Sequence, residues 1–215
     1  MASGFGVKAL MSRLYYLGKM GDEIFALDPS EKRFVRLVLK DPDYEEIKLF
    51  SGFDALEMIT SEPPDPARPE LSEAAAIQKE ESRVKTRRVK KILEHLFAPE
   101  NFPPLWLPGP SVKYASMTGD SPSIALIRLG KEQALLRDPR TNEVQFGFPW
   151  KGGFHAFPLS AKYQELLKGD VTDTIASRKG IKPLLNMVPG ALVLAFTPPH
   201  DGYCKKMVVS ILPKI

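Results

Sequence analysis

Clusters of proline divide this sequence into segments, and they constrain its fold more than any other feature. Twenty prolines occur among 215 residues, about twice the average usage. Half of them gather at 63–69, 103–110 and 198–199. Proline fixes φ and has no N–H to donate, so regular structure is interrupted at each cluster and the chain there is extended. We expect these stretches either to stay mobile or to lie along a neighbour.

The composition is that of a globular chain. Apolar residues make up 43% and charged residues 26%, and apolar runs such as 191–196 are far too short to span a bilayer. The single cysteine, Cys204, excludes an intramolecular disulfide and favours a reducing compartment or an organelle interior. Residues 99–215 carry 14 basic and 9 acidic side chains, an excess too mild for a dedicated nucleic-acid binder.

The first 21 residues form a basic segment with no acidic side chain. Val7, Leu10, Met11, Leu14 and Leu17 recur at spacings of three and four, which predicts an amphipathic helix. An acid-poor basic helix of this kind is typical of a mitochondrial targeting segment. The alternative is an ordinary terminal helix that packs on the body of the protein.

Two turns that begin with Asp-Pro predict β-hairpins. Residues 28–31 separate the predicted strands 23–27 and 32–39. Residues 138–142 separate residues 134–136 from the alternating apolar residues of 144–148. The two hairpins reflect either a weak internal duplication or one common solution used twice.

Further strands are predicted at 124–129, 191–196 and 206–212, and short helices at 53–59 and 160–168, with Ser160 as N-cap. The predicted fold class is therefore α+β, with antiparallel hairpins in the C-terminal half, an N-terminal hairpin and one long central helix. The expected organisation is a basic segment at 1–21, a hairpin and helix region at 22–60, a Pro-rich linker at 61–69, the helix at 70–98 and an α+β domain at 99–215.

The central segment, 70–97, has good helix formers, early acidic residues, late basic residues and a proline just beyond its end. These features predict one charge-dense helix. On it a basic stripe is expected, formed by Lys79, Arg83, Arg87, Arg88, Lys90 and Lys91. Such a stripe could follow a phosphate backbone through salt-sensitive contacts. The alternative is a solvated face balanced by neighbouring glutamates.

The sequence shows no motif for chemistry. The three histidines are far apart, His200 and Cys204 have no second ligand pair, and the glycines form no phosphate loop. We therefore predict no catalytic, cofactor-binding or metal-binding residues. The aromatic residues of 146–157, interleaved with Lys151 and His155, could stack on unpaired bases, or they could belong to a core.

These observations predict a non-catalytic structural or accessory subunit of a large multiprotein or ribonucleoprotein assembly. The expected location is the mitochondrion, with the cytoplasm as the alternative. The expected partners are other protein subunits and, in some assemblies, RNA, with no transmembrane span. One alternative is an RNA- or DNA-binding module that uses the basic stripe. Another is an enzyme of unrecognised type, which would require a deep pocket with convergent polar groups.

Overall fold

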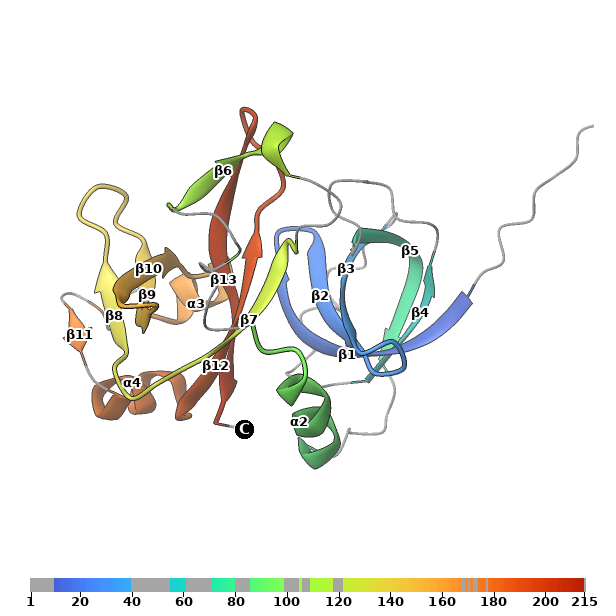
Figure 1. Cartoon of the computed structure of the whole chain (residues 1–215), viewed down its shortest axis with the longest axis horizontal. Coiled ribbons are helices and arrows are strands. Elements are labelled where there is room, and N and C mark those ends of the chain that lie inside the picture. Colours follow the sequence, from blue (N-terminus) through green and yellow to red (C-terminus); the bar gives the residue numbers. More distant parts are fainter. Residues whose placement is uncertain are drawn as a thin grey trace, which may run out of the picture.

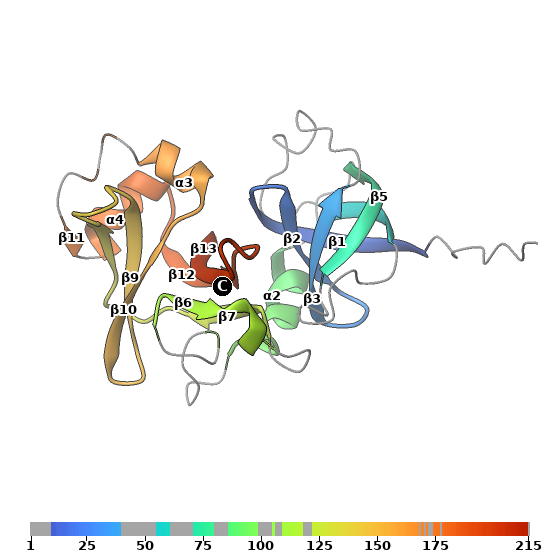
Figure 2. The ribbon, with the colours of Figure 1, turned by 90° about the horizontal axis from the view of Figure 1, so that it is seen from above.

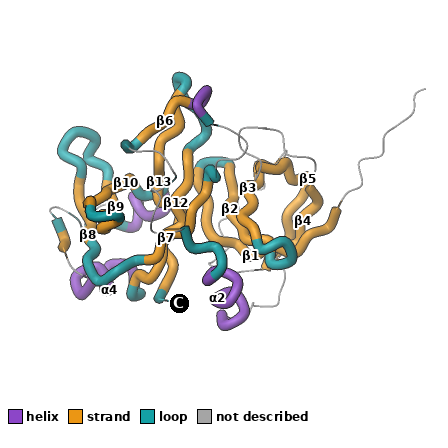
Figure 3. Tube along the Cα trace, in the orientation of Figure 1, coloured by secondary structure: helices purple, strands orange, loops and turns teal. Residues whose placement is uncertain are grey.

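The structure of the chain is a computed structural model. It describes residues 10–39, 55–60, 71–79, 86–98, 105, 109–117, 122–167, 169, 171, 174–176 and 178–214. Strands dominate the described part, and the helices are few and short (Figure 3). The mixed α+β class is thus supported, but one long central helix is not.

The N-terminal part is a closed five-stranded barrel, shown at the right of Figure 1. Its strands are β1 (Leu10–Met20), β2 (Glu23–Asp28), β3 (Arg33–Leu39), β4 (Ala55–Thr60) and β5 (Leu71–Lys79). The order is β1-β2-β3-β5-β4, β1 pairs antiparallel with both β2 and β4, and β3 and β5 run parallel. This is the Greek-key arrangement of the OB-fold barrel.

The C-terminal part consists of two four-stranded sheets. One has the order β6-β13-β12-β7 and the other β10-β9-β8-β11. In the first sheet the strands are β6 (Ser111–Lys113), β13 (Tyr203–Pro213), β12 (Pro189–Phe196) and β7 (Ile124–Arg128). In the second they are β10 (Gly153–Pro158), β9 (Val144–Trp150), β8 (Ala134–Arg137) and β11 (Ile175–Ala176). The helices are α2 (Thr86–Glu94), α3 (Ala161–Leu166), α4 (Arg178–Leu185) and the short 3-10 helix η1 (Tyr114–Ser116).

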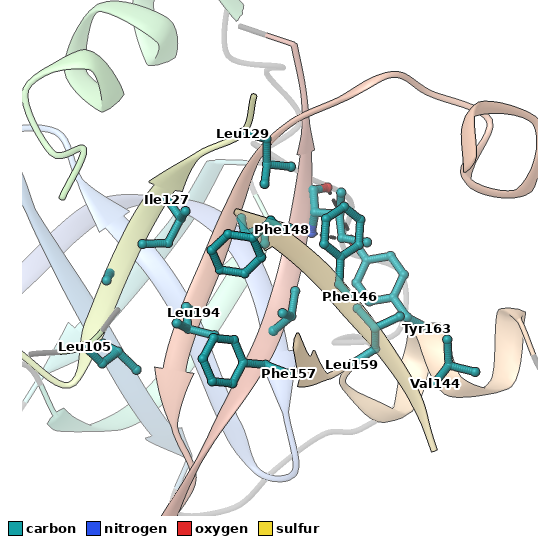
Figure 4. Close-up of a cluster of buried hydrophobic side chains, with 14 of the residues drawn as sticks. Leu105, Ile127, Leu129, Val144, Phe146, Phe148, Phe157, Leu159, Tyr163 and Leu194 are labelled. Atoms are coloured by element: carbon teal, nitrogen blue, oxygen red, sulfur yellow. Dashed lines mark hydrogen bonds between the residues drawn. The ribbon is translucent and has the colours of Figure 1, made fainter. Parts of the chain in front are cut away.

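The sheet that contains β12 is the central layer of the molecule (Figures 1 and 2). Leu192, Leu194 and Phe196 of β12 face the second sheet, where Phe146, Phe148 and Phe157 complete one core (Figure 4). Ala191, Val193 and Ala195 face the barrel and α2, in a second core with Tyr15, Leu17 and Phe25. Every residue from Ala191 to Phe196 is fully buried, which explains why this strand is a continuous apolar run.

Both predicted Asp-Pro hairpins are confirmed, and they share one local geometry. Oδ1 of Asp28 accepts the N–H groups of Ser30 and Glu31, at 2.9 and 3.1 Å. Oδ1 of Asp138 accepts those of Arg140 and Thr141, at 2.8 and 3.2 Å. The backbone N–H groups of the turn also hold the pKa of Asp138 below its ordinary value. Each turn ends on a left-handed residue, Lys32 (φ 52°) or Asn142 (φ 61°). The shared turn therefore follows from local hydrogen bonding.

The predicted N-terminal helix is wrong, because residues 10–20 form strand β1. Leu14, Tyr15, Tyr16 and Leu17 are all buried, and Tyr15 and Leu17 belong to the core that the barrel shares with the central sheet. A strand that is buried on both faces has apolar residues at nearly every position. Helix-like spacings therefore occur in it by chance.

The predicted central helix over 70–98 is also wrong in its first part. Residues 71–79 form β5, which pairs with β3 and β4 to close the barrel, and the helix that follows is only α2. Intrinsic helix propensity is a weak prior that strand pairing overrides. The predicted helix at 53–59 fails for the same reason, since residues 55–60 form β4. The predicted linker at 61–69 lies outside the described residues.

Part of the C-terminal structure was predicted. The strands expected at 124–129, 191–196 and 206–212 occur as β7, β12 and β13, and β12 and β13 pair antiparallel as expected, but β6, β10, β11 and helix α4 were missed. Helix α3 occurs with Ser160 at its N-cap position, but Ser160 makes no capping hydrogen bond. Its hydroxyl donates instead to the Val209 carbonyl, at 3.2 Å, and ties the helix to β13.

A buried arginine, paired with a glutamate of the barrel, joins the barrel to the C-terminal part. Arg36 on β3 is fully buried, and its Nε and Nη2 donate to Oε2 of Glu23 on β2. Its Nη1 donates to Oγ of Ser123, at 2.6 Å, and Nη2 also donates to the Phe196 carbonyl at the end of β12. The guanidinium carbon lies 4.9 Å from the ring centre of Phe25. One side chain thus connects two barrel strands with two segments of the C-terminal part.

We predict that Arg36→Met lowers the free energy of unfolding by about 3–5 kcal/mol, because it leaves Glu23 charged and buried without the guanidinium. Urea unfolding followed by circular dichroism measures this change. The double variant Arg36→Met/Glu23→Met should recover most of the loss, since no unpaired charge remains. A single variant as stable as the wild type would contradict this role of Arg36.

Candidate functional site

Helix α2 is held in place between the barrel and the central sheet (Figure 1). Val89 and Leu93, four residues apart, are fully buried in the core that the barrel shares with β12. After the helix, Phe97 forms a parallel bridge with Leu126 of β7, and the Ala98 N–H donates to the Leu126 carbonyl at 2.8 Å. Contacts on two sides therefore fix the orientation of the helix.

The outer side of α2 is strongly basic. Arg87, Arg88 and Lys91 are exposed and Lys90 is half-buried, and we call these four residues the α2 cationic face. The first turn of the helix contains no acidic residue. Arg87 and Arg88 lie near this end, where the helix dipole disfavours positive charge by roughly 0.3–1 kcal/mol per group. Their position therefore does not serve the stability of the helix.

The predicted basic stripe is only partly assembled. Its four members from Arg87 to Lys91 lie together on α2, but Lys79 is the last residue of strand β5. Arg83 lies outside the described residues. A single helical line from Lys79 to Lys91 does not exist, because the chain changes from strand to helix between them.

The barrel surface on which OB-folds bind oligonucleotides is covered in this protein. That surface is centred on the outer face of the second and third strands. Here the outward-facing residues Phe25, Leu27 and Arg36 have no exposed surface, because the central sheet and α2 pack against them. The fold by itself therefore carries no argument for nucleic-acid binding. Any such binding would have to use another surface, of which the α2 cationic face is the most basic helix side among the described residues.

The aromatic residues of 146–157 belong mainly to the core, as one of the two interpretations predicted. Phe146, Phe148, Trp150 and Phe157 are all buried, and the rings of Phe148 and Phe157 lie 6.0 Å apart. Phe154 differs, with 58% of its surface exposed. Its ring covers Gly147, where a Cβ would come within 2.5 Å of it.

The other candidates for chemistry lie apart. Cys204 is fully buried in the core, whereas His200 is exposed beside Asp201. Within the described ranges, no three His, Cys, Asp or Glu side chains come together as a metal site requires. None of the helices described has the length and apolarity needed to cross a bilayer.

Lys206 is a buried cation that sequence reasoning missed. It lies on β13, two residues after Cys204, and both residues are buried. Only 1% of the surface of Lys206 is exposed. Its Nζ is 5.7 Å from the ring centre of Phe157. Burial lowers the pKa of Lys206 to about 8, because the charged ammonium loses hydration. Lys205 and Lys206 are adjacent in the sequence. Only the register of β13 shows which of the two is buried.

Comparison with known proteins adds no assignment: no protein-family model matches the chain, and no curated protein is significantly similar to it.

We predict that Lys206 makes stability rise with pH. Between pH 8 and about 10.5 the unfolded chain holds a proton on this lysine that the folded chain has lost, so the free energy of unfolding increases across that window. Lys206→Met should raise stability at pH 7 and remove this increase. Urea unfolding at pH 7 and pH 9.5 provides the measurement.

The matched control is Lys205→Met, at the exposed neighbouring position. It should keep the pH dependence of the wild type. If both variants behave alike, Lys206 does not titrate as its burial implies.

Proposed function

We propose that this protein is a non-catalytic subunit of a larger assembly and that the α2 cationic face is a docking surface for a polyanionic partner. The observation that carries the proposal is that α2 is fixed on the body of the protein with this face outward. Val89 and Leu93 anchor the helix from within, while four cations lie along five residues on its outer side. A preorganised surface loses less conformational entropy when a partner binds.

The charges of the α2 cationic face favour a role in binding a partner, because they do not stabilise the fold. Arg87 and Arg88 oppose the helix dipole, so replacing them should cost the fold little. Exposed charges of this kind increase association rates and select partners of opposite charge. The partner is therefore expected to present acidic groups or phosphates.

RNA or DNA is the second candidate partner, and the spacing of the cations favours it. Arg87 and Lys91 lie one helical turn apart on the exposed side, and Arg88 lies beside them. Arginine and lysine side chains in such a row contact successive phosphates without reading sequence. Because the usual OB-fold surface is covered, this binding would be electrostatic and insensitive to base identity.

The experiment is affinity purification of the full chain with mass spectrometry, with and without nuclease treatment. Wild-type protein should retain partners that Arg87→Glu/Arg88→Glu loses. Loss after nuclease treatment identifies a nucleic-acid partner, and retention identifies a protein partner. A wild-type chain that purifies alone, or a variant that keeps every partner, would refute the proposal.

For a nucleic-acid partner we predict a defined salt dependence. Arg87→Glu/Arg88→Glu should weaken binding of a single-stranded RNA at least tenfold and reduce the slope of log affinity against log salt by about 1.4. Fluorescence anisotropy at several salt concentrations measures both quantities. The control Lys131→Glu/Lys179→Glu makes the same change in net charge at exposed positions, one in the loop after β7 and one on α4. Equal effects of the two double variants would show that only net charge matters.

A mitochondrial location is also part of the proposal. Its support is the acid-poor basic composition of residues 1–21. Since Leu10–Met20 is a barrel strand, removing it would open the barrel, so the targeting function would belong to an uncleaved segment. A fusion of residues 1–25 to a fluorescent protein should enter mitochondria. A diffuse cytosolic signal would refute this location.

A further inference from the structure

Arg128, the last residue of β7, is an exposed arginine whose guanidinium lies over an aromatic ring. The guanidinium carbon is 4.0 Å from the ring centre of Phe97, in the segment that follows α2. At this separation an edge-on guanidinium would place a nitrogen inside the van der Waals distance of the ring, so the plane of the guanidinium faces the ring. We call this arrangement the Arg128–Phe97 stack.

The ring of Phe97 is a fixed support for the guanidinium. Phe97 forms a parallel bridge with Leu126 of β7, and its ring packs on the core that the barrel shares with the central sheet. Ile124 and Leu126 belong to that core, and Arg128 lies on the same face of β7, because alternate residues of a strand share a face. The guanidinium is therefore held at the edge of the core, where the chain passes from α2 to β7 (Figure 1).

The polar edge of the Arg128 guanidinium is available to a partner. In the part of the chain that the structure describes, no group accepts a hydrogen bond from it and no carboxylate pairs with it. Glu94 is the acidic residue of α2, and it forms no ion pair with Arg128. Because one face of the guanidinium rests on Phe97, the other face and the edge make up its exposed surface.

The stack lies at the end of the α2 cationic face. Arg87 and Lys91 are one helical turn apart, and His95, exposed one turn further on, continues the same line. Phe97 is two residues beyond His95, so their Cα atoms are at most about 7 Å apart. A single strand whose phosphates follow the α2 cationic face can therefore bring an adjacent base to the stack.

An unpaired nucleobase fits the exposed face of the guanidinium. Bases that are not paired stack on guanidinium planes as they do on aromatic side chains. A base inside a duplex already has neighbours on both faces, and an acidic peptide offers carboxylates without a flat ring. The planar surface therefore favours a single-stranded nucleic acid over both of these partners.

We propose that the α2 cationic face and the Arg128–Phe97 stack form one binding site for single-stranded nucleic acid, in which an unpaired base stacks on the outer face of the Arg128 guanidinium. The inference rests on the proposed function, with nucleic acid as the polyanionic partner. The stack adds a contact with a base to the phosphate contacts of α2. Since every base has a π-face, the site selects single strands without selecting a sequence.

The test compares Arg128→Lys with the wild type by fluorescence anisotropy. Lysine keeps the positive charge but has no planar group, so R128K should weaken binding of a single-stranded oligouridylate of about 12 nucleotides by about fivefold or more. The slope of log affinity against log salt should stay that of the wild type, because the number of cations is unchanged. An RNA duplex and a ribose-phosphate oligomer without bases should each bind R128K and the wild type equally.

The control is Arg140→Lys, at an exposed arginine in the turn between β8 and β9. It should bind all three probes like the wild type. Phe97→Leu should behave like R128K, because the guanidinium loses the ring that orients it. If Phe97→Leu disturbs folding, R128K decides the question, since its substitution is at an exposed position.

Three results would overturn the inference. If R128K binds the oligouridylate like the wild type while Arg87→Glu/Arg88→Glu weakens it, the stack is not part of the site and the proposed function stands. If R128K weakens the oligomers with and without bases equally, Arg128 contacts a phosphate and no base. If the wild type binds none of the probes, the inference fails together with the nucleic-acid candidate, and a protein partner retained after nuclease treatment would leave the α2 cationic face as a docking surface.

Discussion

The arrangement of this protein depends on the burial of Arg36. A guanidinium loses its hydration when it enters a protein interior, and that loss is offset only where charged and polar partners surround it. Here Glu23 supplies the opposite charge from the barrel, and Ser123 and the Phe196 carbonyl supply acceptors from the C-terminal part. These partners belong to three strands or loops far apart in the sequence. They come together only when the barrel packs on the central sheet. The network therefore stabilises this packing and also specifies the position of the barrel.

That docked position determines which surfaces remain for function. The outer face of β2 and β3, which other OB-folds use for oligonucleotides, becomes part of a core. The same packing fixes α2 with its basic side outward and places the guanidinium of Arg128 over Phe97 at the end of this side. Neither surface is a property of the barrel or of the sheets alone. Both result from the contact between the barrel and the sheets.

The sequence predicted local structure far better than it predicted the topology. The Asp-Pro turns and the strands β7, β8, β9, β12 and β13 could be recognised because short-range hydrogen bonding and apolar patterning determine them, whereas β6, β10 and β11 were missed. The strands β1 and β5 could not, since β1 is buried on both faces and β5 is rich in good helix formers that strand pairing overrides. Helix α4 was missed because Pro183 lies inside it. For the candidate site, four of the six basic residues do lie together, on α2. The Arg128–Phe97 stack could not be predicted, because its two residues come from β7 and from the segment after α2, whose proximity depends on the fold.

Native-state hydrogen exchange tests most directly whether the barrel and the central sheet unfold as one unit. The slowest amides of β2 and of β12 should exchange with the same free energy of opening in the wild type. In Arg36→Met both values should fall together and by the same amount. If the β2 amides instead open at a much lower free energy, and the variant changes them while leaving β12 unaffected, the barrel is an independent unit and Arg36 does not join it to the central sheet.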